Sequence, residues 1–250
     1  MAFDIEPASF IRRISLGAAM PTDRYPFDLP VVRGLAESGG LPLPPGATFF
    51  VGENGSGKST LIEAIALAAG LNAEGGSQNY RFTTRATESD LADHLYLTWG
   101  SSKPRSRYFL RAETYYNVAT ATEDLGPEQL AVFGGVSPHE RSHGESFVDL
   151  IHARFFPGGL YVMDEPEAAL SPQGCLNVIA MIADLVTRGS QFIIATHSPI
   201  LLALPGATIF AIDDDGQIER VAYDDAPPVR MTRDFLAAPD RYLRHLTPPD

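Results

Sequence analysis

The sequence predicts an α/β fold in which a mostly parallel β-sheet is flanked by helices, with an antiparallel β subdomain and a short helical lobe. Three observations lead to this prediction. Apolar runs of strand length alternate with segments that have helical periodicity. A glycine-rich loop joins one of these strands to a helix. Acidic residues and a histidine follow two later strands, at the end of the sheet where α/β proteins place ligands.

The composition favours a globular protein with a substantial core. The chain has 250 residues, of which 44% are hydrophobic. Its 31 acidic and 19 basic residues give a net charge of −12, which argues against a uniformly basic nucleic-acid-binding surface but leaves room for a local arginine patch. The single cysteine, Cys175, cannot form an intramolecular disulfide, so we expect a buried thiol and a reducing cytoplasm. No signal-peptide pattern and no run of 18 apolar residues is present, which predicts a soluble protein.

The first 46 residues predict sheet with irregular, proline-rich connections, beginning with a strand over residues 10–16. Tyr25 and Phe27 have two interpretations: an aromatic face for adenine, or packing beneath the proline-rich loop, which we favour. Residues 47–51 are apolar and follow a Pro-Pro-Gly turn, so they predict a buried parallel strand. A helix is expected from Ser59 onward.

The loop between this strand and this helix carries the pattern G-x-x-x-x-G-K-[S/T] at residues 52–59. Its backbone N–H groups and the positive end of the helix dipole would converge on the charge of a triphosphate. Lys58 would reach the β- and γ-phosphates, and the Ser59 hydroxyl would bind Mg²⁺. The predicted nucleotide-binding residues of the loop are Gly52, Asn54, Gly55, Ser56, Gly57, Lys58, Ser59 and Thr60.

The middle of the chain gives weaker signals. Residues 70–87 predict a loop near the nucleotide, in which Gln78 is a candidate sensor of Mg²⁺ and the γ-phosphate. Residues 95–99 and 107–111 predict two strands of an antiparallel hairpin, and residues 113–125 and 127–133 predict helices. The basic residues cluster here, and a solvated strand edge is favoured over contact with a polyanion; they are Arg81, Arg85, Arg105, Arg107 and Arg111.

A further helix is expected to open at Ser142-His143-Gly144-Glu145-Ser146, with Phe147, Leu150, Ile151 and Phe155 on one face. Because Ser142 and Gly144 lie at the amino end of this helix, that end could bind a second anion.

Two strands then end in residues suited to catalysis. Residues 160–163 predict a buried strand that ends in Asp164 and Glu165. Asp164 could hold Mg²⁺, and Glu165 could act as the general base that activates water. Residues 191–196 predict the next strand, and His197 follows it, at a position suited to contact with the γ-phosphate.

Helix starts and one turn complete the pattern. Ser171 and Ser198 are predicted caps, each followed by a proline at the first helical position. Residues 208–212 and 217–223 predict a hairpin around an Asp-Asp-Asp-Gly turn, and residues 232–246 predict a surface helix interrupted at Pro239.

Taken together, GENGSGKST, SHGES, LYVMDEPEAAL and ATHS occur in the order phosphate loop, signature, acidic strand and switch histidine, an order that resembles the ABC-type ATPase superfamily. The resemblance spans most of the chain and is closest to short stand-alone ATPases allied to the chromosome-maintenance and DNA-repair ATPase heads. It implies a P-loop NTPase fold, and one ABC-type ATPase domain over residues 1–250. The nucleotide-binding core would comprise residues 1–70 and 157–250, and residues 71–156 would be an inserted lobe carrying the signature.

The resemblance also implies a homodimer, in which Ser142 and Gly144 of one copy complete the ATP site of the other. This chain departs from the usual LSGGQ signature at Arg141, His143 and Glu145, and it has Ser171 where transporters usually carry Asp. We therefore expect a cytoplasmic, Mg²⁺-dependent ATPase whose ATP-driven dimerisation gates a protein partner or DNA. The alternatives are the nucleotide-binding subunit of a membrane transporter and a slow, nucleotide-gated module in regulation or defence.

Overall fold

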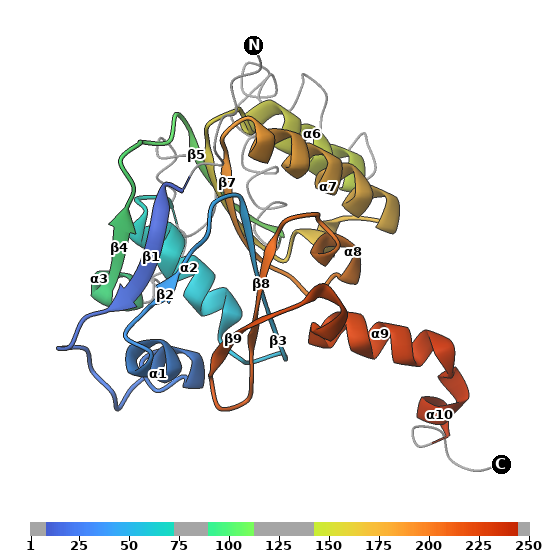
Figure 1. The fold of residues 1–250 in the computed structure, drawn as a ribbon, viewed down its shortest axis with the longest axis horizontal. Helices are drawn as coiled ribbons and strands as arrows, with labels where there is room; N and C mark the ends of the chain where they lie inside the picture. The colour runs from blue at the N-terminus through green and yellow to red at the C-terminus, as the bar shows by residue number, and fades with distance from the viewer. Residues whose placement is uncertain (1–8, 73–89, 113–142, 245–250) are drawn as a thin grey trace.

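The computed structural model describes residues 9–72, 90–112 and 143–244, and a six-stranded sheet forms its centre (Figure 1). The strands lie in the order β5-β6-β7-β3-β8-β9. All neighbours are parallel except β8 and β9, which are antiparallel. Their bounds are β3 Ala47–Gly52, β5 Arg107–Arg111, β6 Leu160–Asp164, β7 Gln191–Ala195, β8 Thr208–Ile212 and β9 Ile218–Val221. The predicted mostly parallel α/β sheet is confirmed.

A second, antiparallel sheet has the order β2-β1-β4, with bounds β1 Ile11–Leu16, β2 Leu41–Pro42 and β4 Leu95–Trp99. The predicted hairpin of residues 95–99 with residues 107–111 is wrong, because β4 pairs with β1 and β5 runs parallel to β6. The burial of the two strands explains the difference. The three central residues of β5 are buried, as in a parallel sheet covered on both faces, whereas β4 is mostly exposed or half-buried.

Alternate residues of β3 enter two separate cores. Phe49 and Val51 pack with α6 to α9 on one face, and Phe50 packs with α1 to α3 and the antiparallel sheet on the other. The helices are α1 Pro30–Glu37, α2 Lys58–Ala68, α3 Leu91–His94, α6 His143–Arg154, α7 Pro172–Thr187, α8 Pro199–Leu202, α9 Pro227–Ala237 and α10 Pro239–Leu243. Short 3₁₀ turns occur at η3 Pro166–Ala169 and η4 Tyr223–Asp225. Figure 1 shows α9 and α10 extending away from the body as an arm.

Several local predictions are confirmed. The Ser171 and Ser198 hydroxyls accept the backbone N–H of Gly174 and Leu201, at 3.1 and 3.3 Å, as helix caps. Phe147 and its predicted face of α6 are buried, and so is Cys175. The interruption at Pro239 separates α9 from α10, although α9 begins before the predicted start. The helices predicted at residues 113–125 and 127–133 lie outside the described residues.

Helix α1 was missed by the sequence analysis, which interpreted its region as irregular. Its sequence does contain the signal, because Pro30 occupies the first helical position and Val31, Val32 and Leu35 recur on one buried face. The turn of the β8–β9 hairpin packs directly on this helix. Gly216 has φ +82°, and a Cβ atom there would lie 2.0 Å from the Pro30 carbonyl carbon.

Buried side chains stabilise the end of the central sheet at which its parallel strands begin. We call this end the amino edge, and the opposite end, where the parallel strands finish, the carboxyl edge. The Gln191 carboxamide accepts the Ile11 N–H at 2.9 Å and donates to the Ile11 carbonyl at 2.8 Å, which joins the two sheets. The Ser190 hydroxyl accepts the N–H groups of Gly158 and Gly159 at 3.1 and 3.3 Å. The Tyr161 hydroxyl accepts from the backbone N–H of Phe156 and donates to its carbonyl.

Candidate functional site

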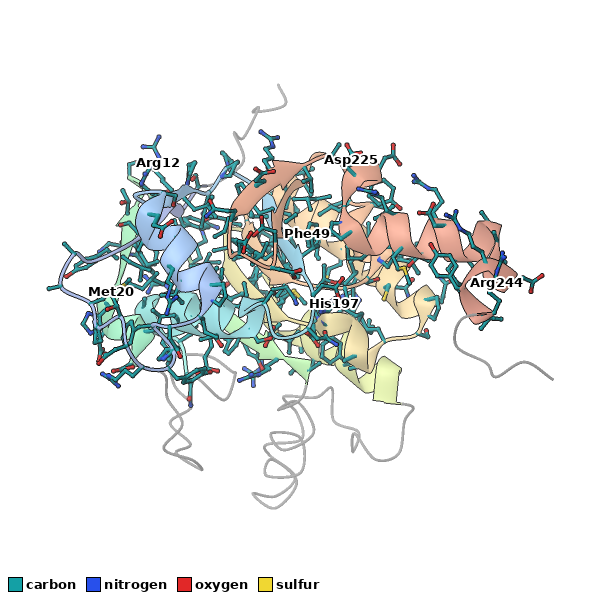
Figure 2. All side chains as sticks on the ribbon, turned by 90° about the horizontal axis from the view of Figure 1, so that it is seen from below. Arg12, Met20, Phe49, His197, Asp225 and Arg244 are labelled. Atoms are coloured by element: carbon teal, nitrogen blue, oxygen red, sulfur yellow. The ribbon has the colours of Figure 1, made fainter. Side chains whose placement is uncertain are left out.

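The parallel strands β3, β6 and β7 end at one edge of the sheet, and the three chemical motifs follow them directly. The phosphate loop follows β3, the two carboxylates end β6, and His197 follows β7. Because β7 lies between β6 and β3, the motifs converge although they are far apart in sequence. Figure 2 looks at the molecule from below, onto this edge, and labels His197 there.

The phosphate loop depends on three glycines. Gly55 and Gly57 have φ of +83° and +88°, a region that other residues adopt only with strain. A Cβ atom on Gly52 would lie 2.8 Å from the Ile212 carbonyl oxygen, and one on Gly57 would lie 2.6 Å from the Val31 side chain. The loop therefore turns tightly into α2, whose amino end points into the concavity that the sequence predicts for phosphate.

Lys58 is held inside this loop and is only 3% exposed. Its Nζ donates to the carbonyl oxygens of Gly52 and Glu53, each at 2.9 Å. Burial lowers the pKa of Lys58, while the nearby carboxylates of Glu165 and Asp164 act in the opposite direction. A buried ammonium group among backbone carbonyls and carboxylates is suited to exchanging these partners for phosphate oxygens.

Asp164 is nearly buried, and Arg111 contacts it from the end of the neighbouring strand β5. The Arg111 Nε lies 3.4 Å from Asp164 Oδ2, and its Nη1 donates to Glu63 Oε2 of α2 at 2.8 Å. Arg111 was expected to lie on a solvated basic edge, and no role was predicted for Glu63. A sequence signal was available, because Arg111 ends an apolar strand in the same way as Asp164.

Glu165 adopts a left-handed conformation with φ 47°, and no other non-glycine residue in the described part of the chain has positive φ. Such a conformation costs about 1–3 kcal/mol in a non-glycine residue and often occurs at functional sites. Its N–H donates to the Ala195 carbonyl at 3.0 Å, which fixes the backbone against β7. The Glu165 Oε1 then lies 3.5 Å from His197 Nε2.

Glu167 is a second residue that the sequence analysis missed. Its Oε1 accepts the backbone N–H of His197, so it joins the turn after β6 to the residue after β7. Among the described residues, three buried polar atoms around the loop and this turn have no hydrogen-bond partner; they are Ser56 Oγ, Glu167 Oε2 and His197 Nε2. Buried polar atoms without partners are uncommon in folded proteins and are consistent with a site that a polar ligand or water completes.

The remaining predicted residues fall into three groups. Ser59 and Thr60 lie in the first turn of α2, and the Tyr25 hydroxyl approaches Thr60 Oγ1 at 3.4 Å from an exposed position. Phe27 is fully buried and packs edge-on against His94, as expected of a core residue. Gly144 lies in the first turn of α6, whereas Ser142 and Gln78 lie outside the described residues, so their roles stay predictions.

The donor set is compatible with Mg²⁺. Ser59 offers a hydroxyl oxygen and Asp164 a carboxylate, which are hard oxygen ligands, and phosphate oxygens and water usually complete such a site. Helix α2, which carries Ser59, packs against β6, which carries Asp164.

Comparison with known proteins finds similarity to ATP-binding proteins. A family model described as "AAA domain" matches residues 35–116, which include the phosphate loop. The cytochrome c biogenesis ATP-binding export protein CcmA of Rhodospirillum rubrum is 29% identical over 190 residues, covering 68% of this chain and 75% of that protein. These similarities support an ABC-type ATPase.

Three further proteins are similar to this chain. The macrolide export ATP-binding/permease protein MacB of Bordetella avium is 24% identical over 205 residues, which cover 72% of this chain but only 30% of MacB. The solved SMC head domain from Thermotoga maritima is 15% identical, with coverage of 85% and 98% of the two chains and a TM-score of 0.44. The cbiO1 structure from Clostridium perfringens is 17% identical, with coverage of 95% and 98% and a TM-score of 0.46.

Similarity to ABC-type ATPases supports ATP binding and ATP hydrolysis. Within the residues that the structure describes, no helix is both long and apolar enough to cross a membrane.

Proposed function

We propose that the protein is a cytoplasmic, Mg²⁺-dependent ATPase in which Glu165 activates the attacking water. The observation that carries this proposal is the position of Glu165, whose strained backbone holds its carboxylate 3.5 Å from His197 Nε2. Burial lowers the pKa of Lys58, and the nearby Glu165 carboxylate acts against that lowering. A base, a phosphate-binding cation and a polar imidazole are therefore available at one edge of the sheet.

Each side chain has a defined task in this proposal. Lys58 would bind the β- and γ-phosphates, while Ser59 and Asp164 would hold Mg²⁺, which neutralises phosphate charge when bound. Glu165 would accept a proton from the water that attacks the γ-phosphorus, and His197 would contact the γ-phosphate through Nε2. The Glu167 carboxylate would orient His197 through its backbone N–H.

We further propose that two copies sandwich two ATP molecules, so that activity depends on protein concentration. The support is the resemblance of residues 142–146 to the signature segment, together with the position of residues 143–146 at the start of α6. A helix amino end that contacts the γ-phosphate of a partner would lose that contact after hydrolysis. ATP would then hold the two copies together and its hydrolysis would release them, which would gate a protein partner or DNA.

The Glu165→Gln variant tests both parts. We expect turnover to fall by about 10²–10⁴-fold, the usual contribution of a general base, while ATP and Mg²⁺ still bind. Gel filtration with Mg²⁺-ATP should show a stable dimer. The matched control is Glu219→Gln, which changes an exposed glutamate on β9 and should leave turnover unchanged. Normal turnover in Glu165→Gln would contradict the catalytic role, and a monomer at saturating Mg²⁺-ATP would contradict the sandwich.

A second candidate function is the nucleotide-binding subunit of a transporter, which is favoured by the export descriptions of the CcmA and MacB relatives. A transporter subunit should co-purify with a membrane protein when it is expressed in its own cell. A slow regulatory module should instead show low turnover, and measurements with and without DNA separate it from a DNA-stimulated ATPase.

A further inference from the structure

A cleft of about 760 Å³ lies at the amino edge of the central sheet, at the end opposite to the phosphate loop. Its walls come from separate parts of the chain that meet where the two sheets join. They are the start of β1, the loop after β4, and the residues that precede β3, β6 and β7. In Figure 1 these parts lie toward the top of the sheet, whereas the phosphate loop lies toward the bottom.

The charges in this cleft are all positive. Arg12, Lys103, Arg105 and Arg188 line it, and no acidic residue belongs to its lining. Only Arg188 has an ion-pair partner among the described residues, Asp184 at 3.0 Å. The protein has a net charge of −12, so four cations with one counter-charge make the cleft much more positive than the protein as a whole.

The walls of the cleft are fixed by backbone contacts. The Gly100 N–H donates to the Phe10 carbonyl at 2.8 Å, and the Arg105 N–H donates to the Gly158 carbonyl at the same distance. The two arginine side chains lie close to glycines. A Cβ atom on Gly158 would lie 3.4 Å from Arg105 Cδ, and one on Gly100 would lie 3.6 Å from Arg12 Cδ. Backbone hydrogen bonds therefore join the segments that carry Arg12 and Arg105 to neighbouring parts of the cleft wall.

We propose that this cleft is a second anion site, which binds a small molecule bearing two or more phosphate groups. Guanidinium groups pair with phosphate oxygens through two parallel hydrogen bonds, and an ammonium group adds a compact charge. The volume falls within the range of small-ligand cavities, which is about 300–1,000 Å³. The cations surround one concavity, and a long nucleic-acid strand that left it would have to cross the surface of an acidic protein.

The test measures binding of inorganic tripolyphosphate by isothermal titration calorimetry, with the phosphate loop filled by Mg²⁺ and a non-hydrolysable ATP analogue. Wild-type protein should bind one equivalent per chain. The double variant Lys103→Gln with Arg105→Gln should bind at least about tenfold more weakly, since two charge-assisted hydrogen-bonding groups are lost. Both residues are exposed, so the fold should persist, as a thermal melt can verify.

The matched control is Arg33→Gln with Arg230→Gln, which removes the same charge from exposed positions on α1 and α9 and should bind normally. Absence of saturable binding, or equal weakening in the two double variants, overturns the proposal. A short single-stranded oligonucleotide is titrated in parallel. If it binds through Lys103 and Arg105 while tripolyphosphate does not, the small-ligand assignment is wrong and nucleic acid is the ligand. None of these outcomes depends on ATP hydrolysis.

Discussion

The amino and carboxyl edges of the central sheet differ in whether their buried polar groups have hydrogen-bond partners. At the amino edge, Gln191 and Ser190 satisfy four backbone groups, and Tyr161 has partners for its hydroxyl. At the carboxyl edge, Ser56 Oγ and His197 Nε2 have no hydrogen-bond partner within the described residues. One hydroxyl inside the sheet, that of Thr48, also has no partner, and nothing in the structure explains it.

This difference suggests that the amino edge serves mainly the stability of the fold and the carboxyl edge mainly its activity. Satisfied hydrogen bonds at the amino edge hold the antiparallel sheet on the central sheet. At the carboxyl edge, a strained Glu165 backbone and a buried Lys58 ammonium group cost free energy in the absence of a ligand. Substitutions at the amino edge should therefore lower stability, and substitutions at the carboxyl edge should mainly lower activity.

The largest stability effect is expected for Gln191→Leu. The substitution leaves the N–H and C=O of Ile11 buried without their side-chain partner, at a cost of about 1–3 kcal/mol for each group. Urea denaturation should show a loss of about 2–6 kcal/mol, with unchanged turnover per folded molecule. Gln173→Leu, at an exposed position on α7, is the control and should be near neutral. A loss below about 1 kcal/mol in Gln191→Leu would break the comparison.

A smaller and more direct contrast comes from the same substitution at each edge. Ser190→Ala removes the acceptor of two glycine N–H groups and should cost about 1–3 kcal/mol. Ser56→Ala removes a hydroxyl without a partner in the described structure, so its stability should change by less than about 0.5 kcal/mol. Thermal unfolding of the two variants side by side measures the difference. Equal losses would show that the edges do not differ.

The smallest effect concerns the pH dependence contributed by Lys58. Because burial lowers its pKa from 10.5 in the folded state, the unfolded chain binds more protons in the window between the lowered value and 10.5. Stability should therefore rise with pH across that window in the wild type, relative to Lys58→Met, which lacks the titrating group. Urea denaturation of both proteins at several pH values in the alkaline range measures this difference. A wild-type curve that falls relative to the variant would contradict the assignment.

The sequence was sufficient to predict those structural features that depend on residues a few positions apart. Glycines with forced backbone angles, a lysine at the helix start and serine caps before prolines act within a few residues, and the structure contains those turns, helix starts and caps. Strand pairing is not local, and for this reason the partner of residues 107–111 was predicted wrongly. Two strand-like segments joined by a short polar loop are typical of a hairpin, which would pair β5 with β4. Only the pairing with β6 buries both faces of β5.

The parts of the candidate site that were missed are those that hold other residues in place. Arg111 contacts Asp164, and Glu167 holds the backbone of His197, across distances of many residues along the chain. Neither contact has a fixed sequence spacing, since each depends on which strands are neighbours. The residues predicted to act on nucleotide were recognisable because their chemistry requires a motif, whereas supporting residues require only proximity.

The β8–β9 turn has a consequence for engineering. Its Gly216 contacts the start of α1 through the backbone, and Val31 of the same helix lies against Gly57 of the phosphate loop. An epitope tag or fluorescent protein inserted at this surface turn, which would otherwise be a natural choice, should displace α1 and loosen the nucleotide loop. Insertions at the end of the α9–α10 arm should be tolerated better, because most residues of α9 and α10 are exposed.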